Sequence, residues 1–114
     1  MKASPPPGDV WTVDFGMAAK HRRVMVVSIQ AADCRLAIAS VVQLTSQSGG
    51  TAYEVTLPRV RWLPEQSYVN AQGVQPVKWT EFEQKCGHFD QIVVEAVRKA
   101  LALWLGTGGQ NAEK

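Results

Sequence analysis

Gly-Asp-Val-Trp-Thr-Val-Asp-Phe at positions 8–15 sets the structural class of this chain. Gly8 and Asp9 are turn residues, and the six residues after them alternate, with β-branched and aromatic side chains in the majority. This pattern predicts a β-strand. Further strands are expected at 24–29, 36–44 and 51–57, with shorter ones at 67–69 and 74–79. The apolar run at 24–29 predicts a central strand, and Pro76 confines the last strand to an edge or a bulge.

A short helix is expected after these strands. Thr80 and Glu83 have the spacing of a capping box, in which the hydroxyl and the carboxylate satisfy the first amides of a helix. Gly87 can take the left-handed conformation that ends a helix. The three residues together predict a helix of one or two turns.

A longer amphipathic helix is expected next, from Asp90 as N-cap to Leu105, with Gly106 ending it. Its expected apolar face comprises Ile92, Val93, Val97, Ala100, Leu101 and Trp104. Strands followed by a terminal helix indicate a β-rich α+β domain, or a β-barrel with a helix packed on it.

The length of 114 residues and the mass of 12.5 kDa allow one hydrophobic core. We expect a single domain at 8–106, with a flexible lead-in at 1–7 and a flexible tail at 107–114. The 46% of hydrophobic residues fits a globular chain, and no apolar run approaches the about 20 residues that span a bilayer. Because the N-terminus lacks an apolar signal segment, the expected location is the cytoplasm.

The cysteines and the charges exclude little by themselves. Cys34 and Cys86 are far apart and lack partners at zinc-ligand spacing, so we expect reduced thiols, no metal and no cofactor. The net charge of +2 does not indicate a nucleic-acid-binding protein. Positions 20–23, however, read Lys-His-Arg-Arg, a cluster that fits either a phosphate-binding patch or a solvated turn.

Two polar side chains stand at the ends of neighbouring expected strands. Arg22 comes just before the second strand, and Thr45 comes just after the third. A guanidinium and a hydroxyl on rigid strands can grip a phosphate while its charge rearranges. Plainer interpretations are that Arg22 pairs with Asp14 or Glu54, and that Thr45 caps the polar turn that it begins.

Six short motifs in a fixed order carry a family resemblance. They are Gly-Asp-Val-Trp-x-Val-Asp-Phe at 8–15, the Arg22-led strand that ends in Ser28, Leu-Thr-Ser-Gln at 44–47, Tyr-Glu-Val at 53–55, Ser-Tyr-Val-Asn-Ala-Gln at 67–72, and Leu-Gly at 105–106. From Gly8 to Gly106 the chain resembles the MazF/PemK toxins of bacterial type II toxin–antitoxin systems. The resemblance implies a small SH3-like barrel of twisted antiparallel strands with short helices, usually a homodimer.

The resemblance also implies an activity, which is metal-independent cleavage of single-stranded RNA at a short sequence motif. The 2′-hydroxyl of the RNA attacks, the products carry a 2′,3′-cyclic phosphate and a 5′-hydroxyl, and a cognate antitoxin protein neutralises the enzyme. The family's catalytic arginine and threonine match Arg22 and Thr45. Because an arginine side chain stays protonated in water, Arg22 suits stabilisation of the phosphorane charge better than proton donation. Thr45 can donate a further hydrogen bond.

Other residues near the expected site have open roles. His21 titrates near neutrality and is a hypothesis for the general base, which the sequence does not identify. The candidate RNA-binding residues are Lys20, Arg23, Ser46, Gln47, Asn70 and Gln72. Asn70 and Gln72 either read bases or only satisfy a bulged strand. Trp62, Tyr68 and Trp79 can stack on unpaired bases, at about 1–3 kcal/mol each, or pack in the core or a dimer interface.

Three features depart from the family pattern. Arg23 takes the usual place of a proline, and the loop at 16–21, which in relatives reaches RNA and lies near the antitoxin, is short. Asn70 and Gln72 stand where one branch uses an arginine and an aspartate, so that branch's mechanism does not carry over. Two alternatives of the same fold therefore stay open: a CcdB-like gyrase poison that binds through its C-terminal residues, and a non-catalytic binding module.

Overall fold

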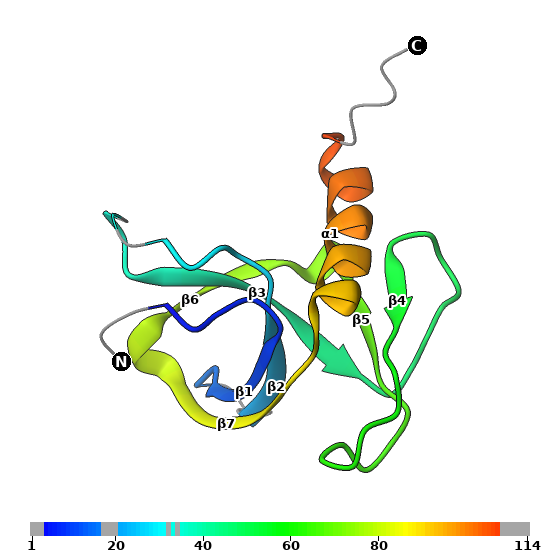
Figure 1. Cartoon of the computed structure of the whole chain (residues 1–114), viewed down its shortest axis with the longest axis horizontal. Helices are drawn as coiled ribbons and strands as arrows, with labels where there is room; N and C mark the ends of the chain where they lie inside the picture. Colours follow the sequence, from blue (N-terminus) through cyan, green and yellow to red (C-terminus); the bar gives the residue numbers. More distant parts are fainter. Residues whose placement is uncertain (1–3, 17–20, 32, 34, 108–114) are drawn as a thin grey trace.

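The computed structural model describes residues 4–16, 21–31, 33 and 35–107. Within these ranges the chain forms seven strands, two short 3₁₀ turns and one α-helix (Figure 1). In chain order the elements are β1 (Asp9–Asp14), β2 (His21–Val26), β3 (Ile38–Thr45), β4 (Glu54–Thr56), β5 (Tyr68–Asn70), η1 (Ala71–Gly73), β6 (Gln75–Lys78), η2 (Trp79–Glu81), β7 (Phe82–His88) and α1 (Gln91–Leu105).

The strands form one antiparallel sheet that curls into an open barrel (Figure 1). Its order is β4-β5-β3-β2-β1-β7, with β6 paired to β3 off this path. The eight-residue strand β3 organises the sheet, because it pairs with β2 along one edge and with β6 and then β5 along the other. The expected β-rich α+β class with a C-terminal helix is confirmed.

Side-chain alternation along the strands divides the hydrophobic interior into two cores. The first, which we call the strand core, draws on β1, β2, β3, β6 and β7 alone and comprises Val13, Val24, Val26, Ala39, Val41, Val77 and Phe82. The second, the helix core, lies where Val97 of α1 and Leu63 pack with Val10 and Met25. Because successive residues of a strand point to opposite faces, each residue of β1, β2 and β3 belongs to one of these two sides.

Helix α1 begins and ends where the sequence predicts. The Asp90 carboxylate accepts a hydrogen bond from the Val93 amide at 3.3 Å, so the N-cap is confirmed. Gly106 has a φ of +74°, the left-handed conformation that a helix-ending glycine adopts most easily. Both signals are local in the chain, which is why they can be recognised in the sequence.

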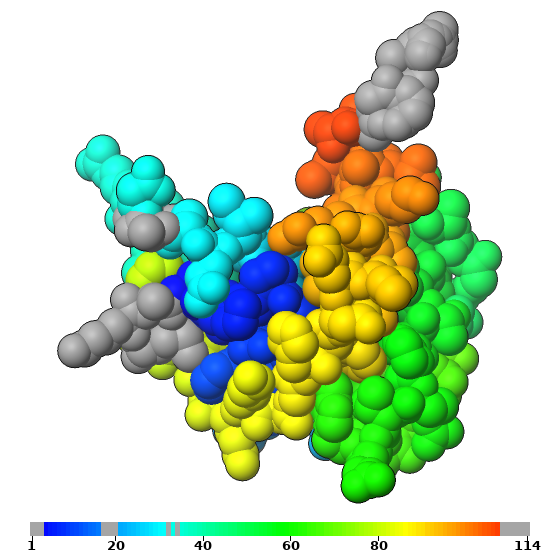
Figure 2. Space-filling model, in the orientation of Figure 1, coloured from blue at the N-terminus to red at the C-terminus, as the bar shows by residue number. Residues whose placement is uncertain are grey.

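The apolar face of α1 is narrower than predicted. Its buried residues are Val94, Val97 and Ala100. Ile92, predicted on this face, is 77% exposed, because a residue two positions from Val94 points about 200° away from it. The C-terminal part of α1 projects as a ridge beyond the sheet (Figure 2), where Trp104 is 44% exposed and contacts the Tyr53 ring edge-on.

The helix predicted from Thr80 and Glu83 is wrong. The chain makes only the η2 turn there and continues into β7, which pairs with β1 along its whole length. Pairing with an inner strand outweighs a local capping signal. Gly87 does not end a helix either, since it lies within β7, where an added Cβ would collide with the ring of Trp62.

A buried carboxylate fastens β1 to β7. The Asp9 side chain is 3% exposed and accepts hydrogen bonds from the Trp11 indole at 3.1 Å and from His88 Nδ1 at 2.7 Å. The Lys85 ammonium lies 3.5 Å from the same carboxylate. A buried charge is tolerated when it is paired and hydrogen-bonded, so this cluster stabilises the contact between β1 and β7.

The ends of the chain lie partly outside the described residues. Of the predicted flexible lead-in, Ser4 is buried, and its carbonyl accepts a hydrogen bond from the Gln30 side chain at 2.8 Å. Pro76 lies in β6, whose only strand partner in the described ranges is β3, so its predicted edge position is confirmed. Residues 1–3, Lys20, Cys34 and 108–114 lie outside the described residues. No helix in the described part has the length and apolar character needed to cross a bilayer.

Candidate functional site

Arg22 and Thr45 lie at the same end of two adjacent strands. Strands β2 and β3 are antiparallel and pair from Val26 opposite Val41 to Val24 opposite Gln43, so Arg22 and Thr45 lie just beyond the paired residues. Alternation from Val24 on β2 and from Val41 on β3, both in the strand core, places both side chains on the strand-core side of the sheet. Both residues are exposed, because they stand at the ends of their strands. Two groups that are distant in sequence are thereby brought together.

The Arg22 side chain has no hydrogen-bond or ion-pair partner among residues 4–16, 21–31, 33 and 35–107. The carboxylates that a strand-end arginine would pair with are engaged elsewhere. Asp14 accepts a hydrogen bond from the Gly16 amide at 2.7 Å, and Glu54 accepts from the amide of Gly49 at 2.6 Å. The guanidinium is therefore available to an anion, which it can grip with two parallel donors.

Thr45 caps a turn and keeps a donor. Its Oγ1 accepts a hydrogen bond from the Gln47 amide at 3.2 Å, so the capping role that the sequence suggests is present. A hydroxyl that accepts one hydrogen bond still carries its own proton. The O–H of Thr45 can therefore donate to an oxygen held by Arg22.

A cavity of about 400 Å³ borders both residues. It is lined by the ends of β1, β2 and β3 on one side and by residues of the segment 63–67 on the other. His21, Arg22 and Arg23 line it together with one carboxylate, that of Glu65. This volume lies within the range of about 300–1,000 Å³ that small-ligand sites occupy, and the charges favour an anion.

The strand pleat separates the basic residues at positions 21–23. In the β1–β2 register Val13 is opposite Arg22, whereas Thr12 is opposite Arg23 and Asp14 is opposite His21. Arg22 thus points to the strand-core side with Thr45. His21 and Arg23 point to the helix-core side, where the 400 Å³ cavity extends toward the segment 63–67.

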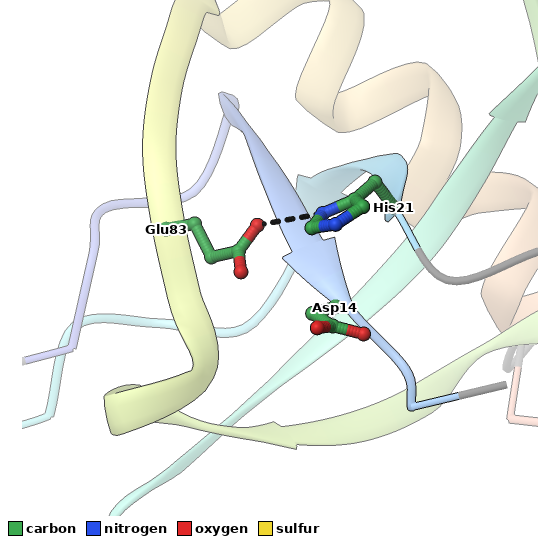
Figure 3. A group of neighbouring side chains, drawn as sticks. All are labelled: Asp14, His21 and Glu83. Atoms are coloured by element: carbon green, nitrogen blue, oxygen red, sulfur yellow. Dashed lines mark hydrogen bonds and ion pairs between the residues drawn. The ribbon is translucent and has the colours of Figure 1, made fainter.

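His21 contacts one carboxylate and lies near a second. Its Nδ1 lies 3.0 Å from Oε1 of Glu83 on β7, across the intervening strand β1 (Figure 3). Asp14, opposite His21 on β1, brings its carboxylate to within 4.8 Å of the other two groups. These three side chains are close enough to share a cation, but the hydrogen bond between His21 and Glu83 satisfies both atoms without one. We assign no metal to them.

Three of the other candidate RNA-binding residues line one of two cavities. Ser46 lines the 400 Å³ cavity, and Gln47 and Asn70 line a second cavity of about 270 Å³ that also borders Thr45. Gln72 lines neither cavity. Its backbone N–H donates a hydrogen bond at 2.9 Å to Asn70 Oδ1, which caps the η1 turn. Asn70 therefore has a structural use already.

Most of the large aromatic side chains are used in packing. Trp62 packs on Phe89 beside the helix core, with ring centroids 5.1 Å apart, and Trp79 packs beside the strand core. Trp11 meets Phe82 edge-on at 5.8 Å. Tyr68 lines the second cavity, which makes it the aromatic candidate for stacking on a base.

Glu54, which the sequence analysis considered only as a partner of Arg22, holds a loop beside the site instead. Its carboxylate accepts hydrogen bonds from the Gly49 amide at 2.6 Å, from the hydroxyls of Thr51 and Ser48 at 2.9 Å each, and from the Gly50 amide at 3.2 Å. The Gly49 amide, followed by the two hydroxyls, lowers the pKa of Glu54. An ionised Glu54 thus fixes the loop that follows Thr45. A carboxylate just after a Ser-Gly-Gly-Thr turn is the sequence signal for it.

Comparison with known proteins agrees with this architecture. An endoribonuclease from a mycobacterial species, solved in complex with its cognate antitoxin, superposes with a TM-score of 0.77 at 24% identity, over 90% of this chain and 96% of that one. A MazE–MazF complex from Deinococcus radiodurans superposes with a TM-score of 0.74 at 23% identity, over 90% and 95% of the two chains. At these identities the likeness shows the fold. No protein of curated function matches the sequence.

The family itself is shown by sequence. Residues 6–105 match the model of the PemK-like, MazF-like toxins of type II toxin–antitoxin systems. The match spans the sheet, the strand ends that carry Arg22 and Thr45, and helix α1. The resemblance noted from the short motifs is therefore confirmed, and the chain belongs to the MazF/PemK toxin family.

Proposed function

We propose that this toxin is an endoribonuclease that cuts single-stranded RNA at a short sequence motif, with Arg22 and Thr45 acting on the cleaved phosphodiester. The observation that carries the proposal is that one anion-compatible cavity is bordered by the Thr45 hydroxyl and by the Arg22 guanidinium, which has no side-chain partner among the described residues. Membership of the toxin family and the likeness to endoribonucleases support it.

The proposed reaction uses the RNA's own 2′-hydroxyl. The O2′–P bond forms as the P–O5′ bond breaks, O2′ loses a proton and O5′ gains one, which leaves a 2′,3′-cyclic phosphate and a 5′-hydroxyl. Negative charge accumulates on the non-bridging oxygens in the transition state. Arg22 and Thr45 donate to these oxygens, so they stabilise the transition state more than the substrate.

The substrate form is proposed from the exposed strand ends, and the partners and the location are proposed from membership of the family. A single strand can be laid over exposed strand ends with its bases splayed, which a duplex does not allow. We propose a homodimer in the cytoplasm that needs no metal ion. A cognate antitoxin neutralises it by covering the basic residues at 21–23 with an acidic segment.

The test is cleavage of a long transcript by the purified protein in EDTA, with the cut positions mapped and the product ends identified. We expect cuts at one short motif, with cyclic phosphate and 5′-hydroxyl ends. Arg22→Ala should lower the rate by at least about 10²–10³-fold, because one oxyanion donor is typically worth that much. The cleavage rate of Arg22→Lys should lie between those of the wild type and Arg22→Ala, since lysine keeps the charge and loses the planar guanidinium.

Two results would overturn the proposal. One is a transcript that stays intact with the wild-type protein, both in EDTA and with added Mg²⁺ or Zn²⁺. The other is an Arg22→Ala variant that cuts at the wild-type rate. Thermal unfolding of both proteins shows that the comparison is between folded molecules.

A further inference from the structure

We propose that the helix-core side of the 400 Å³ cavity binds the nucleotide adjoining the cleaved bond, with Arg23 holding its phosphate and His21, fixed by Glu83, accepting a hydrogen bond from its base. This inference rests on the proposed function. It assigns His21 to binding, in place of the general-base role that the sequence suggested.

The pleat of β2 is the first argument. His21 and Arg23 point to the opposite face from Arg22, so they do not converge on the phosphate that Arg22 and Thr45 hold. All four residues nevertheless border one cavity at the ends of the strands. An RNA strand that crosses these strand ends meets Arg22 and Thr45 on one face and His21 and Arg23 on the other. The two pairs of residues can therefore bind consecutive nucleotides.

The lining of the cavity is the second argument. Leu44 and Leu63 supply apolar surface, and Thr12, Ser46 and Ser67 supply hydroxyls around it. An apolar wall with a few polar groups suits a flat base, while the Arg23 guanidinium suits the phosphate attached to it. Arg23 stands where the family pattern usually has proline, so this phosphate contact would be a property of this chain rather than of the family.

A β-bulge aims Glu83 at His21. Strand β1 pairs Thr12 with Gln84 and Val13 with Phe82, so Glu83 is the extra residue of β7 at this step. Such bulges redirect a side chain, and here the carboxylate reaches His21 Nδ1 at 3.0 Å. The register irregularity thus creates the contact.

The Glu83 contact decides the tautomer of His21. An ionised carboxylate only accepts hydrogen bonds, so Nδ1 of His21 must carry the proton. In the neutral imidazole Nε2 is then an acceptor. His21 can therefore take a hydrogen bond from a base N–H group, such as an exocyclic amine, in the cavity that it lines.

The experiment uses a short single-stranded oligonucleotide that contains the mapped motif, and a 2′-deoxy analogue that binds without being cut. Arg23→Gln should raise KM for cleavage and Kd for the analogue about 10-fold to 100-fold, as expected for one charge-assisted hydrogen-bonded contact, with kcat within about threefold. It should also reduce the slope of log Kd against log salt by about 0.7, one phosphate contact to a single strand. Lys78→Gln, on β6 at the far end of β3, is the matched control and should change neither.

His21→Asn and Glu83→Gln test the base contact. Both should weaken binding of the analogue by about 3-fold to 10-fold, and the loss should vanish on an oligonucleotide that carries an abasic position next to the cleaved bond. Glu81→Gln, in the neighbouring η2 turn, should have no effect.

Two outcomes would overturn the inference. In the first, Arg23→Gln leaves Kd and its salt slope unchanged. In the second, His21→Asn lowers kcat with KM unchanged and removes the rise of kcat with pH, which is the signature of a general base. If the wild-type protein cuts no transcript, the proposed function fails before any motif is mapped. If it cuts RNA and either of these outcomes is found, the subsite alone fails, so the two failures are distinguishable.

Discussion

The hydroxyl of Thr45 caps the Gln47 amide and, in the proposed reaction, donates to the phosphate. A substitution at this position separates its effect on stability from its effect on the cleavage rate. Thr45→Val keeps the shape of the side chain and removes the donor. It also removes the 3.2 Å hydrogen bond from the Gln47 amide. Because this amide is exposed and water can replace the lost partner, we expect the free energy of unfolding to fall by no more than about 1 kcal/mol.

The effect on cleavage should be much larger. Loss of one donor to the developing oxyanion is worth about 2.7–4 kcal/mol, so Thr45→Val should lower the single-turnover rate by about 10²–10³-fold. Thr45→Ser keeps the hydroxyl and should stay within about tenfold of the wild type. The assay is cleavage of the mapped oligonucleotide with enzyme in excess, beside thermal unfolding of each variant. A Thr45→Val rate within about threefold of the wild type would show that the hydroxyl does not act on the oxyanion, as would equal losses of rate in the valine and serine variants.

Three further predictions concern the scaffold of the site. Gly87→Ala should lower the free energy of unfolding by about 1–3 kcal/mol, because the new Cβ meets the Trp62 ring, whereas Gly73→Ala, which meets open space, should not; denaturant unfolding of both checks this. The lowered pKa of Glu54 means that its contribution to loop stability is complete above the ordinary glutamate pKa of about 4.3 and is lost as the pH falls through the lower folded-state value. The protection factors of the loop amides against hydrogen exchange, which are corrected for the intrinsic pH dependence of exchange, should therefore fall only in that acid window, and Glu54→Gln should remove this dependence. Asp90→Ala should cost about 1 kcal/mol in thermal unfolding through loss of the N-cap of α1, and an unchanged melting temperature would contradict the capping role.

The parts of the fold that could be predicted are those whose signals are local. The N-cap Asp90 and the helix-ending Gly106 act on backbone groups within a few residues, so the sequence contains the whole interaction. Thr80 and Glu83 carry the same kind of signal, and it failed because pairing of β7 with β1 competes with it. That competition depends on a strand some 70 residues away, which no window of sequence contains.

The candidate site shows the same division. Arg22 and Thr45 could be proposed from their positions at strand ends and from the family motifs, because both features are visible in the sequence. The contact between His21 and Glu83 could not, since it joins residues 62 positions apart through a bulge in the β1–β7 register. The separation of Arg22 from its two neighbours likewise needs the faces of β2 to be known.

The central claim is that Arg22 and Thr45 hold one phosphodiester between them. A crystal structure of the wild-type protein with an oligonucleotide of the mapped motif, 2′-deoxy at the cleaved nucleotide, measures this directly. We expect the phosphate at the cleaved position to lie within hydrogen-bond distance, about 2.7–3.2 Å, of both the Arg22 guanidinium and the Thr45 hydroxyl. A phosphate at that position bound away from this pair, or contacted by only one of the two, would contradict it.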